Sequence, residues 1–188
     1  THYNYGIKAL HKGKLKEAEQ NFRRVLELSP NHADAHNNLG VILYKLGKYE
    51  EAEISYTHAL KIKPNNSQIY NNLGITQQEL GKLDQAKLTY EKALALNPED
   101  SSVFWNLSGL ANSITDAEQC LSNCLKVNKN HQWALLTKAA LKYYQGEKTA
   151  FNDLKLSKFS NHPFMRSFSW AFSLPSLPEL YFNRWSFF

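Results

Sequence analysis

The sequence has no run of eighteen consecutive apolar residues, the length that a membrane-spanning helix needs, so it predicts no membrane insertion. It shows no cleavable leader either, although the chain opens on Thr1 and an upstream segment could have carried one. Cysteine is scarce: only Cys120 and Cys124 occur, one helical turn apart, a spacing unfavourable for a disulfide or a zinc site. We interpret both as small core residues in a reducing compartment, which makes the cytoplasm the expected location.

Catalytic motifs are missing as well. The sequence holds no glycine-rich phosphate loop, no nucleophile elbow and no Ser/His/Asp arrangement. His32 and His36 share a helical face, but they lack the glutamate of an HExxH motif and a third ligand, so we interpret them as solvated. Glu17, Glu51 and Asp116 are likewise interpreted as solvated surface charges. We therefore predict no catalytic residue, no metal site and no cofactor, and expect this chain not to be an enzyme.

Positive charge is in modest excess, with 22 Lys and Arg against 17 Asp and Glu and a net charge of +5. Nucleic-acid binding requires such cations to be clustered into a patch or stripe. Here they are scattered singly or in pairs, and the densest group, from Lys8 to Lys16, is interrupted by a turn at Gly13. We predict a solvated surface and no nucleic-acid partner.

What the sequence does contain is an internal repeat, in which Asn37-Asn38-Leu39-Gly40 returns as Asn71-Asn72-Leu73-Gly74. A glycine, a small alanine, an aromatic residue and a proline share the period that separates these two copies. They are Gly13, Gly47 and Gly81; Ala18, Ala52 and Ala86; Phe22, Tyr56 and Tyr90; and Pro30, Pro64 and Pro98. Apolar residues at helical spacing lie on both sides of Gly47 and of its counterparts, and they predict two helices per repeat. The glycine would end the first helix and the proline would follow the second.

This pattern resembles the tetratricopeptide repeat family, in which a period of about 34 residues is typical. Its Asn-Leu-Gly copies are most similar to the arrays of O-GlcNAc transferases and related bacterial proteins. The resemblance implies an all-α fold, a right-handed superhelix of about five helix hairpins with a C-terminal aromatic helical segment.

Residues 1–128 would hold four repeats, the first truncated at its start. The fourth is shortened by three residues in its turn, with Ser108 in place of the Leu-Gly glycine and Lys129 in place of the proline. Residues 129–160 would form a degenerate fifth hairpin or cap, with helices near 131–145 and 147–158.

The composition changes after Ser160, because residues 161–188 hold nine aromatic residues and three prolines. Phe164, Phe168 and Phe172 stand four apart and predict one helix, which we expect to cap the fifth hairpin. The rest of this segment is either the lead-in to a further domain or a contact that joins two copies of the chain into a homodimer.

An asparagine precedes each Leu-Gly position, at Asn4, Asn38, Asn72 and Asn106, always one repeat period apart. In related arrays the first helices line the concave surface, so the resemblance places these four in a row along a groove. A side-chain amide donates and accepts at once, and can pair with the N–H and C=O of an extended peptide. With packed helices about 8–10 Å apart and a rise of about 3.3 Å per residue, one asparagine would serve about every third peptide residue. In the alternative interpretation, the asparagines bridge neighbouring helices or cap a first turn.

Further residues are expected to line the groove beside these asparagines. They are Asn37, Asn71, Val41, Ile75, Tyr44 and Trp105, flanked by Tyr3, Ile7, Lys45, Gln78 and Glu79. Carboxylate-clamp arrays of the family bind chaperone tails with Lys and Arg on these faces, which are mostly Asn, Val and Ile here. We predict a non-catalytic scaffold that binds a protein or an extended peptide. The alternative is the substrate-recruiting N-terminal region of a larger enzyme, a transferase of methyltransferase or glycosyltransferase type.

Overall fold

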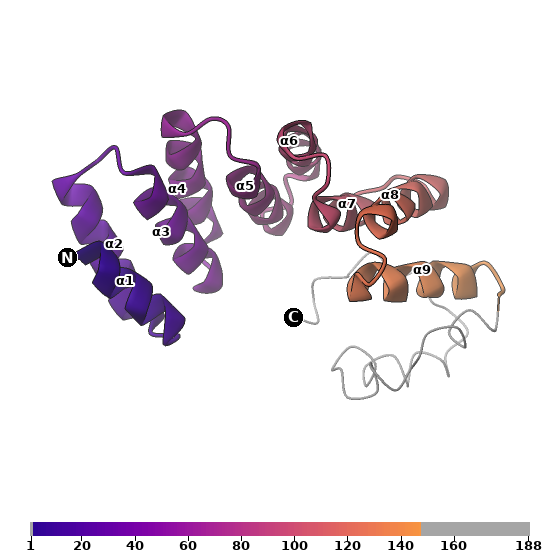
Figure 1. Ribbon diagram of the computed structural model, residues 1–188, viewed down its shortest axis with the longest axis horizontal. Coiled ribbons are helices and arrows are strands. Elements are labelled where there is room, and N and C mark those ends of the chain that lie inside the picture. Colours follow the sequence, from indigo (N-terminus) through magenta and orange to yellow (C-terminus); the bar gives the residue numbers. More distant parts are fainter. Residues whose placement is uncertain (1, 148–188) are drawn as a thin grey trace. The chain divides into compact units, whose positions relative to one another are not determined.

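The computed structural model describes residues 2–147, which form nine α-helices and no strand (Figure 1). The helices are α1 (His2–His11), α2 (Leu15–Leu28), α3 (Ala33–Lys45), α4 (Tyr49–Ile62), α5 (Ser67–Glu79), α6 (Leu83–Leu96), α7 (Ser101–Ser108), α8 (Ile114–Val127) and α9 (Gln132–Tyr144). Within this part of the chain, every helix is too short or too polar to cross a bilayer. The chain divides into two compact units, residues 1–103 and residues 104–188, which we call unit 1 and unit 2.

Unit 1 consists of helix hairpins in chain order (Figure 1). α1 packs on α2, α3 on α4 and α5 on α6, and the second helix of a hairpin also packs on the first helix of the next. The turn inside each hairpin is made by Gly13, Gly47 and Gly81, whose positive φ values of 70°, 74° and 71° favour glycine. Each second helix ends two residues before its proline. The predicted fold class, an all-α array of helix hairpins, is confirmed.

The glycines of the Leu-Gly positions have a different role, because they allow the two helices of one hairpin to approach closely. A Cβ on Gly40 would lie 2.7 Å from the ring of Tyr56, and a Cβ on Gly74 would lie 2.5 Å from the ring of Tyr90. Both rings are buried, with exposed fractions of 2% and 0%. The first hairpin repeats this contact with Gly6 and Phe22. An aromatic ring from the second helix therefore fills the space that the missing side chain leaves.

The core of the third hairpin contains buried polar side chains. Thr76, Gln77 and Gln78 are buried there. Their counterparts at the same repeat positions of α3 are Ile42, Leu43 and Tyr44. Thr89 donates to Gln77 Oε1 at 2.8 Å, and Tyr90 donates to Gln78 Oε1 at 2.7 Å. Each buried amide oxygen thus receives a donor from α6, which removes the cost of an unpaired acceptor.

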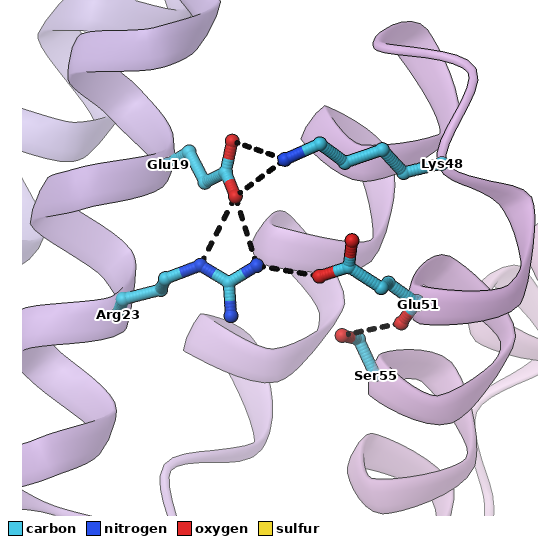
Figure 2. A network of polar contacts seen from close by, with 5 residues as sticks. All are labelled: Glu19, Arg23, Lys48, Glu51 and Ser55. Carbon is cyan, nitrogen blue, oxygen red and sulfur yellow. Dashed lines mark hydrogen bonds and ion pairs between the residues drawn. The ribbon is translucent and has the colours of Figure 1, made fainter.

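A lysine in front of α4 and another in front of α6 each bind a carboxylate of the preceding hairpin. Lys48 Nζ lies 3.1 Å from Glu19 Oε1, and Lys82 Nζ lies 2.6 Å from Glu53 Oε2. The second pair stands one repeat period after the first, so the contact recurs with the repeat. Figure 2 shows the first pair, in which Arg23 also donates to Glu19.

The carboxylates interpreted as solvated charges remain exposed, but two of them form ion pairs. Arg23 donates to Glu51 Oε2 at 2.7 Å and so links α2 to α4 (Figure 2). Lys14 lies 3.0 Å from Glu17 Oε2. Asp116 lies in the first turn of α8, where its N–H donates to the Ser113 hydroxyl. The interpretation was therefore incomplete for Glu17 and Glu51, because sequence spacing alone did not show their partners.

Glu19 should make unit 1 sensitive to acid. Burial acts to raise the pKa of the Glu19 carboxyl, but hydrogen bonds and charge from Arg23 and Lys48 outweigh it and hold this pKa below its usual value. Because the folded-state pKa is lowered, the Glu19 carboxylate stabilises the fold above its unfolded-state pKa of about 4.3. This contribution is lost as the pH falls through the folded-state pKa. Urea unfolding at several pH values should show a smaller acid-induced loss of stability for Glu19→Gln than for the wild type. Glu50→Gln, at an exposed position, is the matched control. An equal loss of unfolding free energy at low pH in the wild type and in Glu19→Gln would contradict this expectation.

The described part of unit 2 has its own core, in which α8 packs against α9. This core consists of Ala117, Leu121, Cys124, Ala134 and Leu141, with Phe104, Trp105, Ala111 and Leu125 packed against it. Cys124 is buried and Cys120 is half-buried, in agreement with their interpretation as core residues. α7 has eight residues, against 13 in α3 and in α5.

The first helix expected for the fifth hairpin, near 131–145, corresponds to α9. Its N-terminus is capped by His131, whose Nδ1 accepts the N–H of Ala134 at 3.2 Å. The second helix expected near 147–158 lies outside the described residues, apart from its first position. The same holds for the aromatic segment 161–188 and its predicted helix.

Candidate functional site

The row of asparagines is carried by the first helices of the hairpins. Asn4 lies on α1, Asn38 on α3 and Asn72 on α5, all in unit 1, whereas Asn106 lies on α7 in unit 2. Asn4 is exposed, Asn38 and Asn72 are half-buried, and Asn106 is buried, with an exposed fraction of 4%. The structure therefore brings three of the four asparagines onto successive helices of one unit.

The three asparagines of unit 1 differ in their hydrogen bonds. Asn38 Nδ2 donates to Tyr3 Oη at 3.2 Å, which bridges α3 and α1. This contact corresponds to the structural alternative considered for the asparagines. Asn4 and Asn72 make no side-chain hydrogen bond within residues 2–147. Their amides, the Asn38 Oδ1 and one Asn38 N–H are available to a ligand.

An aliphatic row accompanies the asparagines. Ile7, Val41 and Ile75 follow them by three residues, which places each on the same helix face as its asparagine. All three are half-buried. We call the surface formed by Asn4, Asn38, Asn72, Ile7, Val41 and Ile75 the asparagine face, and α1, α3 and α5 its inner helices. It offers amides and aliphatic carbon side by side.

Two tyrosine contacts link neighbouring inner helices. Tyr3 ties α1 to α3 through Asn38, and Tyr44 Oη donates to Glu79 Oε1 at 3.2 Å, which ties α3 to α5. Burial is the main cause that raises the pKa of the Tyr44 hydroxyl, and the neighbouring charge of Glu79 raises it further. The hydroxyl therefore remains a donor at physiological pH. The predicted groove residue Tyr44 thus links α3 to α5.

Asn37 contains a buried polar atom that the described residues do not satisfy. Its Oδ1 is buried and has no hydrogen-bond partner there. Asn37 occupies the repeat position that Tyr3 holds on α1, where the longer tyrosine side chain reaches the next inner helix. An unpaired buried acceptor costs about 1–3 kcal/mol. Sequence reasoning placed Asn37 in the groove but gave no sign of this unpaired oxygen.

The remaining predicted site residues do not all lie in the same unit. Asn71 is half-buried on α5 in unit 1. Trp105 lies in unit 2, where its Nε1 donates to Thr137 Oγ1 at 3.4 Å and its ring lies 6.1 Å from that of Trp133. The described residues therefore place most of the predicted site residues on α1, α3 and α5 of unit 1, and the groove itself stays a prediction, as do Trp105 and Asn106 as members of it.

The interpretation of His32 and His36 as solvated was incomplete, because both are only partly exposed and have structural partners. His32 Nδ1 accepts the Ala35 N–H at 3.2 Å and caps α3, and its ring stacks on Tyr3. His36 Nε2 donates to the Pro30 carbonyl at 2.8 Å. Within residues 2–147, no group of three or more His, Cys, Asp or Glu could hold a metal ion.

Sequence reasoning also missed an open cleft of about 520 Å³ beside these histidines. It is lined by residues 29–34, Ile62 and Lys63. Lys63 Nζ lies 2.8 Å from Asp34 Oδ1 and joins the end of α4 to the start of α3. The lysine and the aspartate of this lining are thus already paired with each other, and the cleft lies outside the asparagine face.

Comparisons with known proteins point to one family. A model described as tetratricopeptide repeat matches residues 33–66 and 67–100, and a model described as TPR repeat matches residues 10–47. A tetratricopeptide repeat protein from Parabacteroides merdae is 28% identical, with a TM-score of 0.74, over 86% of this chain and 66% of that one. Pseudomonas aeruginosa pilF is 27% identical, with a TM-score of 0.71, over 79% of this chain and 69% of that one.

A third solved structure shares the fold at lower identity. YrrB, a TPR protein with an unusual peptide-binding site, is 17% identical, with a TM-score of 0.67, over 85% of this chain and 89% of that one. At this identity the likeness concerns the fold alone. Among curated proteins, none matches the chain.

Proposed function

Because the chain belongs to the tetratricopeptide repeat family, whose repeats generally serve as protein-interaction scaffolds, we propose that it binds an extended segment of a partner protein on the asparagine face. The observation that carries this proposal is the row of side-chain amides on three successive inner helices. The side-chain amides of two of its members, Asn4 and Asn72, make no hydrogen bond within the described residues. In the structural alternative, the asparagines bridge neighbouring helices or cap a turn, and their side-chain amides would then be paired.

The chemistry of the face suits a peptide backbone. An amide donates to a peptide C=O and accepts from a peptide N–H without regard to the side chain between them, so the asparagines supply affinity that tolerates many sequences. Ile7, Val41 and Ile75 offer apolar contact one helical turn away.

Three further predictions remain open. The homodimer through residues 161–188 depends on a segment outside the described residues. The absence of a nucleic-acid partner rests on the scatter of charge in the sequence. The alternative of a substrate-recruiting region in a larger enzyme concerns the full-length protein.

Changing Asn4 and Asn72 to Ala together should weaken peptide binding. The probes are ligands selected from a random library of peptides about twelve residues long, enough to span the roughly 16–20 Å from α1 to α5. Each asparagine loses hydrogen bonding worth about 0.5–1.5 kcal/mol, so the double variant should lose about 1–3 kcal/mol, or about five- to 150-fold in Kd by fluorescence anisotropy.

The matched control replaces Asn65 and Gln85, which are exposed and lie off the asparagine face, with Ala. Both double variants should keep the wild-type unfolding midpoint. Wild-type affinity in the Asn4→Ala/Asn72→Ala variant, or equal losses in the two variants, would count against the proposal.

A further inference from the structure

The first hairpin displays a stripe of side chains whose counterparts are buried in the later hairpins. Tyr5, Lys8 and Lys12 follow one another at helical spacing and lie on one side of α1. Lys8 and Lys12 are exposed, and the exposed fraction of Tyr5 is 54%. Gly6, which meets the ring of Phe22 on α2, is buried. The side of α1 that packs on its own hairpin is therefore covered, whereas the stripe is not.

In the second and third hairpins the same stripe packs on the hairpin before it. It consists of Leu39, Ile42 and Leu46 on α3, and of Leu73, Thr76 and Leu80 on α5. The first two members of each set are buried and the third is half-buried. α3 packs on α2 of the preceding hairpin, and α5 packs on α4. Because α1 has no such neighbour within the described residues and its stripe is exposed, we attribute the burial on α3 and α5 to the preceding second helix. The stripe is thus shaped to receive an α-helix.

A lysine in front of the second helix belongs to the same surface. Lys48 Nζ lies 3.1 Å from Glu19 Oε1 on the preceding second helix, and this contact recurs one repeat later. Lys14 holds the equivalent position in the first hairpin, where it pairs with Glu17 of its own hairpin at 3.0 Å. Both side chains of that pair are more than half exposed, so the pair is weak. We call the surface formed by Tyr5, Lys8, Lys12 and Lys14 the end face.

The end face is basic. α1 contains no carboxylate. Each carboxylate of α2 is already paired with a lysine or an arginine. Lys8 and Lys12 form no ion pair within residues 2–147. The stripe therefore offers two cations one helical turn apart that nothing in the described part of the chain neutralises.

This charge decides between the possible occupants. A further hairpin of the same pattern would bury Lys8 where Ile42 packs in an apolar core, and an unpaired buried charge is costly. A second copy docked face to face would oppose lysine to lysine. A helix with carboxylates one turn apart would instead neutralise Lys8 and Lys12, and its apolar side chains would cover the ring of Tyr5.

We propose that the end face docks an acidic amphipathic α-helix of a partner protein. Two carboxylates of that helix, four residues apart, pair with Lys8 and Lys12, and a third pairs with Lys14. Apolar side chains of the same helix cover Tyr5. The asparagines of α3 and α5 take no part in this docking, so it is independent of the peptide-binding function.

Selection from a library of helical peptides tests this proposal. The peptides are about eighteen residues long, or about 27 Å of helix, carry one randomised face and are selected on the full chain. We expect a class of binders with two Asp or Glu residues four apart. In fluorescence anisotropy their affinity should fall at least about tenfold in the Lys8→Glu/Lys12→Glu variant, and it should fall as the salt concentration rises.

Charge reversal provides the control for folding. When the two acidic residues of such a peptide are replaced by lysine, it should lose the wild type and bind the Lys8→Glu/Lys12→Glu variant, a rescue that a misfolded chain would not give. The matched control, Lys87→Glu/Lys92→Glu at exposed positions of α6, changes the net charge equally. It should bind the original peptide as the wild type does.

Several results would overturn the proposal. They are the absence of any such class of binders, equal losses in the two double variants, and a failed rescue. Self-association of the wild type that the Lys8→Glu/Lys12→Glu variant loses, measured by sedimentation, would show that a second copy occupies the end face instead. Displacement of the peptide by a random-sequence DNA duplex at physiological salt would show a surface for phosphates, and would overturn the proposal as well.

Discussion

Gly74→Ser should destabilise the chain by about 1–3 kcal/mol, although glycine is the poorer helix former. Any Cβ at this position would lie 2.5 Å from the ring of Tyr90, which is fully buried. The ring must move, and a close-packed core leaves it little room. Ala95→Ser on the exposed side of α6 is the control and should change the urea unfolding midpoint little.

A second substitution should restore part of this loss. The fourth repeat has Ser108 at the glycine position and Leu121 at the aromatic position, both buried. The joint change suggests that a leucine in place of the aromatic ring leaves room for the serine side chain. Gly74→Ser combined with Tyr90→Leu should therefore be less destabilised than the sum of the single variants, by about 0.5–3 kcal/mol. Strict additivity would show that the glycine and the ring do not constrain each other.

Ile42→Ala should cost about 2–5 kcal/mol, the usual range for truncating a buried aliphatic side chain. Ile42 is fully buried in the core of unit 1. Lys8 occupies the same repeat position on α1 and is exposed, so Lys8→Ala should stay within about 0.5 kcal/mol of the wild type. The difference tests whether burial at this position comes from stacking on a preceding hairpin. Similar losses in the two variants would contradict that packing.

Much of the fold was predictable because its signals are local and recur with the repeat. A glycine at a positive φ and a proline after a helix act through their own backbone, so Gly47 and Pro64 could be interpreted from the sequence alone. The contact between Gly40 and Tyr56 is different, because it requires knowing which ring meets which glycine. Its signal was present all the same: both positions recur with the repeat, and both change together in the fourth copy.

The candidate site was predictable only in part. Periodicity placed Asn38 and Asn72 at equivalent positions, and the structure places them on successive inner helices. It could not show that Tyr3 reaches Asn38, because the length of one side chain and the distance between two helices decide that bond. Nor could it show that His32 caps α3, since a histidine is an uncommon cap and the sequence pattern resembled an incomplete zinc motif.

The most direct test of peptide binding on the asparagine face is NMR of the side-chain amides in the full chain, titrated with a library-selected peptide. The amide resonances of Asn4, Asn38 and Asn72 should shift in proportion to the bound fraction. Those of Gln20 on α2 and Gln85 on α6, which are exposed on the second helices of their hairpins, should not move. Shifts at Gln20 and Gln85 with unchanged asparagine resonances would contradict the account.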